Sequence, residues 1–194
     1  MIHVATRSYS NGLAKLKLGV IIYLVYAIAS IIGGFAVLVP PFLTGSFLVP
    51  STLTPVLRAS TLNIVLKAIG LVIILFAFWY LYNGFKSLKA SRFPNDAGRT
   101  GIIGVTIQVI GVVISFVSVI LTGFAAGTVA ELGVAAAGGI IAFVGAIFTM
   151  LAFYKVGSNY NSTIVKVGGI LFLLINFVGD ILLFIGLDEI TKKR

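Results

Sequence analysis

The sequence predicts an all-α membrane protein, a bundle of five transmembrane helices in a single domain over residues 1–194. Three observations support this fold class: long apolar runs, a scarcity of charge, and an uneven distribution of basic residues between the runs. A helix rises about 1.5 Å per residue, so about 20 apolar residues cross a hydrocarbon layer about 30 Å thick. Runs of that length lie at residues 18–39, 64–84, 101–123, 132–154 and 164–187.

The composition is that of a chain with little material for a soluble domain. Hydrophobic residues make up 59% of the chain, charged residues 10%, and the mean hydropathy is +1.16. A soluble domain has about 25% charged residues, which face water. We interpret the net charge of +9 as a sign of membrane orientation and anionic-lipid contact, not of nucleic-acid binding. The absence of cysteine excludes disulfides, thiol catalysis and cysteine-ligated metals.

Basic residues near the ends of the runs predict the orientation, because Lys and Arg resist translocation. Nine basic residues fall on one side of the predicted spans. Four fall on the other side: Arg58 in the first loop and the tail residues Lys192, Lys193 and Arg194. We therefore expect a cytoplasmic N-terminus and an external C-terminus, with the basic tail as the one feature that disagrees. The nine residues on the cytoplasmic side are Arg7, Lys15, Lys17, Lys86, Lys89, Arg92, Arg99, Lys155 and Lys166.

The segment 42–61 is expected to be an external loop between the first two spans. It is rich in Ser, Thr and Pro, and Pro50 and Pro55 argue against a sixth span. Two interpretations remain open: an ordinary hydroxyl-rich loop, which the composition favours, and a hairpin that dips into the membrane interface.

Small and weakly polar residues predict which helix faces meet, because in lipid they let backbones approach and hydrogen-bond. The third and fourth runs carry such residues at alternating steps of four and three, which keeps them on one helix face. A polar pore lining is the alternative, but so few hydroxyl and amide groups favour packing. The two stripes are Gly104, Gln108, Gly111, Ser115, Ser118 and Thr122, and Ala135, Gly138, Ala142, Gly145, Thr149 and Ala152.

Two ionisable side chains lie within the runs. Asp180 follows Asn176 by four residues in the fifth run, so both share a face, and Lys67 lies in the second run. Counted across five spans, Lys67 and Asp180 are at similar depth, which predicts a buried ion pair. The alternatives are a protonated Asp180 bonded to Asn176 or a carbonyl, and an ion- or proton-relay carboxylate.

The sequence offers little to an enzyme. His3 is the only histidine, so no metal cluster can be assembled around it, and no Gly-rich phosphate loop follows a strand. We expect no catalytic residue, no cofactor and no bound metal.

Several short stretches make the chain resemble DUF973, an archaeal multispanning membrane family of unknown function. The resemblance covers nearly the whole chain and implies an archaeal cytoplasmic membrane, but it supplies no activity and no site residues. It rests on Asn11-Gly12-Leu13 with Lys15 and Lys17, Phe153–Gly157, Asn159–Asn161, Lys166–Leu171, Gly179-Asp180-Ile181 and Ile185-Gly186-Leu187.

Two functional hypotheses follow. The first is a non-enzymatic structural or accessory subunit of a membrane assembly, in contact with lipid and with other subunits or copies of itself. The second is a small ion- or proton-coupled transporter, or a channel-forming oligomer, that uses Asp180. Transporters usually contain repeats and helices broken near the midplane. No proline falls within a run, and five spans do not divide into equal halves, so the sequence favours the first hypothesis.

Overall fold

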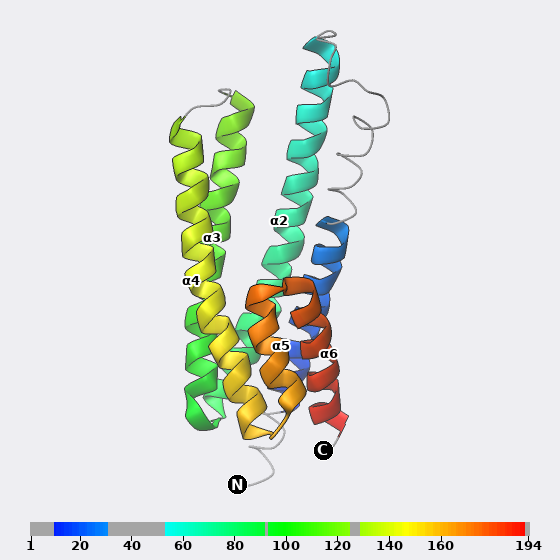
Figure 1. Cartoon of the computed structure of the whole chain (residues 1–194), viewed down its shortest axis with the longest axis vertical. Coiled ribbons are helices and arrows are strands. Elements are labelled where there is room, and N and C mark those ends of the chain that lie inside the picture. Colours follow the sequence, from blue (N-terminus) through cyan, green and yellow to red (C-terminus); the bar gives the residue numbers. More distant parts are fainter. Residues whose placement is uncertain (1–9, 31–52, 92, 125–128, 193–194) are drawn as a thin grey trace.

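The computed structural model is a bundle of helices that run along one long axis (Figure 1). It describes residues 10–30, 53–91, 93–124 and 129–192, apart from the side chains at 53–64, 66, 118–124 and 129–132. The described segments form an N-terminal helix (Ser10–Ser30), α2 (Leu53–Ala90), the short 3-10 helix η2 (Pro94–Asp96), α3 (Ala97–Phe124), α4 (Val129–Asn159), α5 (Thr163–Leu174) and α6 (Asn176–Lys192).

Within the described residues, four helices are long and apolar enough to cross a membrane: Ser10–Ser30, Lys67–Ala90 within α2, Pro94–Val117 across η2 and α3, and Gly133–Asn159 within α4. Each corresponds to one of the first four predicted spans. The first begins eight residues earlier than its apolar run, and the part of that run beyond Ser30 lies outside the described residues. The chain is therefore all-helical where it is described, with apolar helices of membrane-crossing length.

The predicted loop at 42–61 is wrong in its second half. α2 begins at Leu53 and continues without interruption to Ala90, so residues 53–61 are helical. Pro55 does not break this helix, because it lies in the first turn, where a backbone N–H has no helical partner to lose. The remainder of the loop, residues 42–52, lies outside the described residues.

The predicted fifth span is wrong, because it is two helices and not one. α5 ends at Leu174, Ile175 has φ −137° and ψ 78°, and α6 begins at Asn176. The 12 residues of α5 extend about 18 Å, which is too short for a hydrocarbon layer of about 30 Å. Figure 1 shows α5 rising to about half the height of the bundle and α6 returning beside it. The two helices form a hairpin.

Glycines define how the hairpin packs. A Cβ atom built on Gly168 would lie 2.9 Å from the backbone nitrogen of Leu183. A Cβ atom on Gly186 would lie 3.0 Å from the backbone nitrogen of Val165, and one on Gly179 would overlap the backbone of Phe172. These contacts pair residues at increasing distance on either side of Ile175, as antiparallel helices require. Only glycine lets the two backbones approach so closely.

The hairpin returns the end of α6 to the end of the bundle where the N-terminal helix begins (Figure 1). The Lys17 ammonium forms an ion pair with the Asp188 carboxylate, which joins these two segments directly. An external C-terminus opposite a cytoplasmic N-terminus was expected from five crossings. The structure instead places the end of α6 at the same end of the bundle as the start of the N-terminal helix, because the chain reverses at Ile175.

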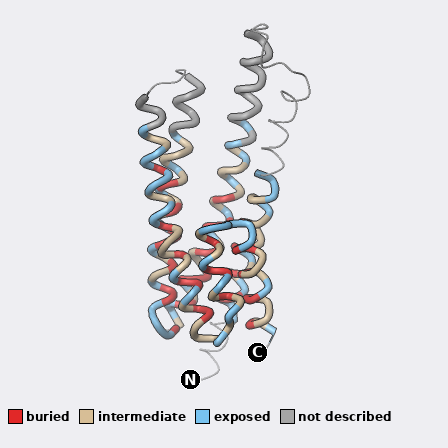
Figure 2. The backbone as a smooth tube through the Cα atoms, in the orientation of Figure 1, coloured by how far each residue is buried: buried red, intermediate tan, exposed pale blue. Residues whose placement is uncertain are grey.

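The packed core lies in the half of the bundle that contains the hairpin, where buried residues concentrate (Figure 2). Aromatic rings connect the elements there. Tyr23 of the N-terminal helix contacts Phe78 of α2 and Phe172 of α5, with ring centroids 5.8 and 5.5 Å apart. Phe153 of α4 contacts both Phe172 and Phe85 of α2, at 6.2 and 5.4 Å. Phe172 therefore places the hairpin against two other elements at once.

The glycine contact in the hairpin generates a stability prediction. Gly179→Ala should destabilise the protein by about 1–3 kcal/mol, because the new methyl group overlaps the backbone of Phe172 and α6 must move. The measurement is the free energy of unfolding in detergent micelles. The matched control is Gly139→Ala in α4, where a Cβ atom meets nothing within 4 Å. This control should be neutral or stabilising by up to about 1 kcal/mol, and equal losses at both positions would contradict the packing described.

Candidate functional site

Asp180 is the most unusual residue of the described core. The residue is 0% exposed, and neither oxygen of its carboxyl group has a hydrogen-bond partner among the described residues. Burial of an ionised carboxylate without a partner costs several kcal/mol or more. Buried polar groups in proteins are almost always paired, so an unpaired acid in the core requires an explanation.

Two polar side chains lie beside Asp180. The phenol of Tyr23 and the side-chain amide of Asn176 form a hydrogen bond, and Tyr23 is close enough to Asp180 to interact with it electrostatically. Asn176 is one helical turn before Asp180 in α6, and it is exposed. Tyr26, one turn after Tyr23, packs edge-on against it at 6.3 Å between centroids. A cluster of an acid, an amide and a phenol thus extends from the core to the hairpin tip.

The break between α5 and α6, at Ile175, directly precedes Asn176 of this cluster. Because α5 stops at Leu174, the last carbonyl groups of α5 lack the N–H partners that a continuous helix would supply. The N–H of Ile175 bonds to the Leu171 carbonyl at 2.7 Å, and the N–H of Gly179 bonds to the Ile175 carbonyl at 3.0 Å. Asp180 is in the second turn of α6, so it also lies near the positive end of that helix dipole.

The structure does not bring Lys67 to Asp180. Lys67 is exposed on α2, and the two residues form no ion pair in the described part of the chain. Tyr23, beside Asp180, is level with Phe78, and Lys67 lies about three helical turns, or roughly 16 Å, from Phe78 along α2. The similar depth expected for the two residues assumed a fifth crossing. The reversal at Ile175 moves Asp180 to the other half of the bundle.

The two small-residue stripes lie against each other between α3 and α4. A Cβ atom on Gly104 would lie 2.6 Å from the backbone nitrogen of Thr149, and one on Gly138 would lie 2.6 Å from that of Ser115. Between these ends, Gly111 faces Ala142 and Gly145 faces Gln108 at backbone contact. Ser118 and Thr122 are in α3, but their side chains lie outside the described residues. The helices therefore run antiparallel at close range.

One buried hydrogen bond lies within this interface. The Thr149 hydroxyl donates to the Gln108 side-chain oxygen at 2.8 Å, and it is also 3.1 Å from the Gly145 carbonyl. Gln108 is 4% exposed and Thr149 is 0% exposed. The polar members of the stripes are thus bonded to one another inside the contact, which is a packing arrangement rather than a wet lining.

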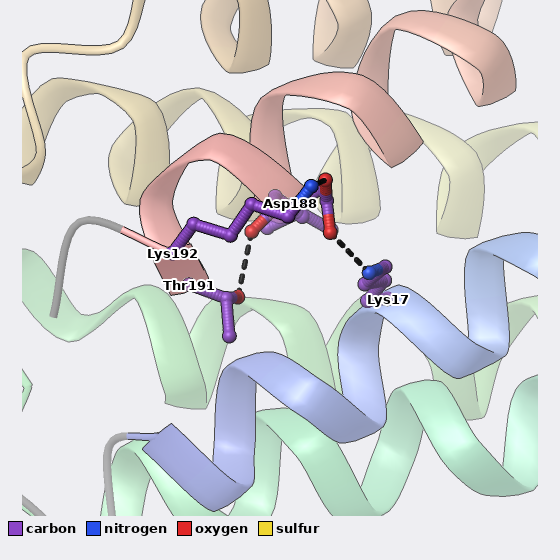
Figure 3. A network of polar contacts seen from close by, with 5 residues as sticks. Lys17, Asp188, Thr191 and Lys192 are labelled. Carbon is purple, nitrogen blue, oxygen red and sulfur yellow. Dashed lines mark hydrogen bonds and ion pairs between the residues drawn. The ribbon is translucent and has the colours of Figure 1, made fainter.

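A second polar cluster closes the basic end of the bundle (Figure 3). Asp188 of α6 binds Lys17 of the N-terminal helix through one oxygen and Lys192 through the other, the latter at 2.7 Å. Thr191 donates to the Leu187 carbonyl at 2.7 Å. The hydrogen bonds from Lys17 and then from Lys192 hold the pKa of the Asp188 carboxyl below its usual value. Sequence reasoning missed this cluster because it placed the two helix ends on opposite sides.

Sequence reasoning also missed the role of Tyr23, and the only signal was its position. Tyr23 lies four residues after Gly19 and three before Tyr26, on one face of the first helix. That spacing predicts a contact face but not the partner. The break at Ile175 had only a weak signal: neither glycine nor proline occurs there, although Asn176, a residue type common at helix ends, follows directly.

The α3–α4 contact generates the second prediction. Gly111→Leu should lower the free energy of unfolding by about 1–3 kcal/mol, because the backbone of Ala142 occupies the space that a side chain would need. Val113→Leu is the matched control, since Val113 is 42% exposed on the same helix. It should be nearly neutral when both variants are unfolded in the same detergent. Similar losses in both would contradict this interface.

The Asp188 cluster generates a pH prediction. Because the folded pKa lies below the unfolded value of about 3.9, the ion pairs stabilise the fold fully above that value. Their contribution is lost as the pH falls through the lowered folded pKa. Asp188→Asn should therefore lower the melting temperature in neutral buffer and make its decline in acid shallower. Asp96→Asn is the control, because Asp96 is exposed and forms no ion pair within the described residues. An unchanged acid profile in Asp188→Asn would contradict the assignment.

Comparison with known proteins identifies the family of this chain. No curated protein and no solved structure matches it. A family model described as "Protein of unknown function (DUF973)" matches residues 10–194. This match begins at the first described residue of the N-terminal helix and includes every helix described above, the hairpin with Asp180 among them. The chain therefore belongs to the DUF973 family of proteins of unknown function.

Proposed function

We propose that this protein is a non-enzymatic integral membrane protein that acts as a structural or accessory subunit of a membrane assembly. It crosses the cell membrane four times, and the α5–α6 hairpin enters the membrane without crossing it. On the sequence resemblance, that membrane is archaeal. The start of the N-terminal helix and the end of α6 both face the cytoplasm. The exposed apolar surface of the long helices is the observation that carries this proposal.

Large apolar side chains cover the outer faces of the long helices. Ile140 of α4 is 66% exposed, and Ile110 and Val117 of α3 are 49% and 44% exposed. Soluble monomers rarely expose apolar patches on this scale, whereas such surfaces match lipid or a neighbouring membrane helix. On α2 the exposed residues follow steps of four and three along one face: Val65, Ile69, Val72, Phe76 and Trp79.

The charge distribution supports the orientation once the hairpin is included. With four crossings, Lys192, Lys193 and Arg194 join the nine basic residues already assigned to the cytoplasmic side. Only Arg58 and Lys67 of the 14 Lys and Arg residues are then left elsewhere. The disagreement between the basic tail and the rest of the chain disappears, which is the pattern expected from the positive-inside rule.

A second candidate function is supported by a specific observation. The helix break at Ile175, beside the buried carboxyl of Asp180, resembles the discontinuous helices that form ion sites in transporters. No proline interrupts a predicted span, but the last apolar run is broken at Ile175, which removes one reason for disfavouring transport. A small ion- or proton-coupled transporter, or a channel-forming oligomer, is therefore the alternative.

Native mass spectrometry after purification in mild detergent distinguishes the two functions. The accessory role predicts an assembly of defined stoichiometry, with another subunit or with further copies of this chain, that carries neither ions nor protons in reconstituted liposomes. A monomer that carries ions or protons in reconstituted liposomes, and loses this activity in Asp180→Asn, would contradict the accessory role and establish the alternative.

The four-crossing arrangement generates a labelling prediction. Because the chain lacks cysteine, single cysteines can be introduced at Asn161 in the α4–α5 turn, at Thr191 near the end of α6, and at Thr128 between α3 and α4. In intact cells, a membrane-impermeant maleimide should label only the Thr128→Cys variant. Asn161→Cys and Thr191→Cys should react only after permeabilisation. External labelling at Thr191 without labelling at Asn161 would mean that the fifth apolar run crosses the membrane.

A further inference from the structure

A structural or accessory role does not explain the surroundings of the Asp180 carboxyl group. Its carboxyl group is 0% exposed with both oxygens unbonded, whereas the carboxylate of Asp188 in the same helix binds two lysines. An ionised carboxylate in such a place needs a compensating charge or several donors. The structure supplies neither to Asp180. A neutral carboxyl group tolerates the same surroundings at a much smaller cost.

No cation compensates Asp180 from any described element packed around it. The N-terminal helix contributes the phenols of Tyr23 and Tyr26, and α6 contributes the amide of Asn176. The face of α5 against α6 is built from Gly168, Phe172 and other apolar residues. Lys17 and Lys192 are engaged by Asp188, which is two helical turns further along α6.

The same observations favour a proton over a metal cation as the ligand of Asp180. A metal cation held by oxygen atoms takes about six ligands, several of them carboxylates or carbonyls. The described cluster offers one carboxyl group, and its amide and phenol are already bonded to each other, so the carbonyl groups at the end of α5 would have to supply the rest of a cage. A proton requires one oxygen and no cage, so it fits this site.

We propose that Asp180 is a proton-binding site whose carboxyl group is protonated at neutral pH and exchanges its proton through the hairpin tip. Tyr23 and Asn176 mark the exchange route, because Asn176 is exposed and Tyr23 links it to the buried acid. In the exchange, the O–H bond of the carboxyl breaks and the proton passes to water at the Asn176 end. The Tyr23 hydroxyl then donates to the carboxylate that remains.

An apolar carbodiimide tests the proposal, because it reacts with protonated carboxyl groups in apolar surroundings. The carboxyl adds across a C=N bond and rearranges to an N-acylurea, so the protein gains the full mass of the reagent. The purified full chain, in mild detergent and in liposomes, is treated with dicyclohexylcarbodiimide at about pH 7. An ordinary aspartate, with a pKa of about 3.9, is ionised at that pH. We expect one adduct per chain, located at Asp180 by peptide mapping.

Matched variants locate the reaction. Asp180→Asn should lose the adduct, whereas Asp188→Asn should keep it, because Asp188 is paired and lies outside the core. Asp180→Glu retains a carboxyl group and should keep the adduct, which separates loss of the acid from loss of the fold. Tyr23→Phe should extend labelling to higher pH, because the carboxylate loses its donor. A purely structural role for Tyr23 would leave this pH profile unchanged.

Three results would overturn the proposal. The first is a folded wild-type protein without an adduct at about pH 7. The second is equal labelling of Asp180→Asn. The third is protection by sodium chloride relative to choline chloride at constant pH and ionic strength, which would identify a metal-cation site instead. Native mass spectra of the same samples report the assembly state separately, so failure of the accessory role and failure of the proton site are distinguishable.

Discussion

The close backbone contact between α5 and α6 sets the positions of the other elements in the packed half of the bundle. Gly168, Gly179 and Gly186 allow the two helices to lie against each other without side chains between them. Because the two helices pack so closely, the hairpin fits beside the N-terminal helix in one half of the bundle. The burial of Asp180, its electrostatic interaction with Tyr23 and the ion pair between Lys17 and Asp188 all follow from that position.

The buried polar residues of the described core differ in their hydrogen bonding. Gln108 and Thr149 satisfy each other across the α3–α4 contact, so their burial costs little and holds the helices in register. Asp180 is equally buried but has no partner. Among the described residues, a buried acid without a hydrogen-bond partner beside a helix break is the group most suited to a change of charge.

The basic end of the bundle is held by polar contacts between turns. The Asn95 side chain donates to Asn159 at 3.0 Å, and Asn159 donates in turn to the Pro94 carbonyl at 3.1 Å. Lys155 donates to Thr100 at 2.9 Å. These bonds join the η2 turn and α3 to the end of α4. The end that carries most of the charge is therefore also the end where the hydrogen bonds between elements gather, as suits a headgroup region where polar groups need no burial.

The amino-acid pattern alone was enough to predict that the chain is helical and apolar, where four long helices lie, and which stripes of α3 and α4 face each other. Run length and the spacing of small residues are local properties, so hydropathy and helical period report them directly. The positions of Lys67 and Asp180 relative to each other depended instead on the direction of the chain after Leu174. Hydropathy does not report the direction of the chain, because an apolar residue transfers to lipid equally well in a helix that continues and in one that turns back.

The reversal after Leu174 depends on tertiary contacts. Ile175 is apolar and β-branched, and Asn176 alone is a weak signal for a helix end, so the break arises from contacts on both sides of it. Glycines of α6 meet α5, Phe172 packs against Tyr23 and Phe153, and Asn176 bonds to Tyr23. The two contacts with Tyr23 join segments more than a hundred residues apart in the chain. The combined packing of all these contacts outweighs the single helical turn lost at Ile175.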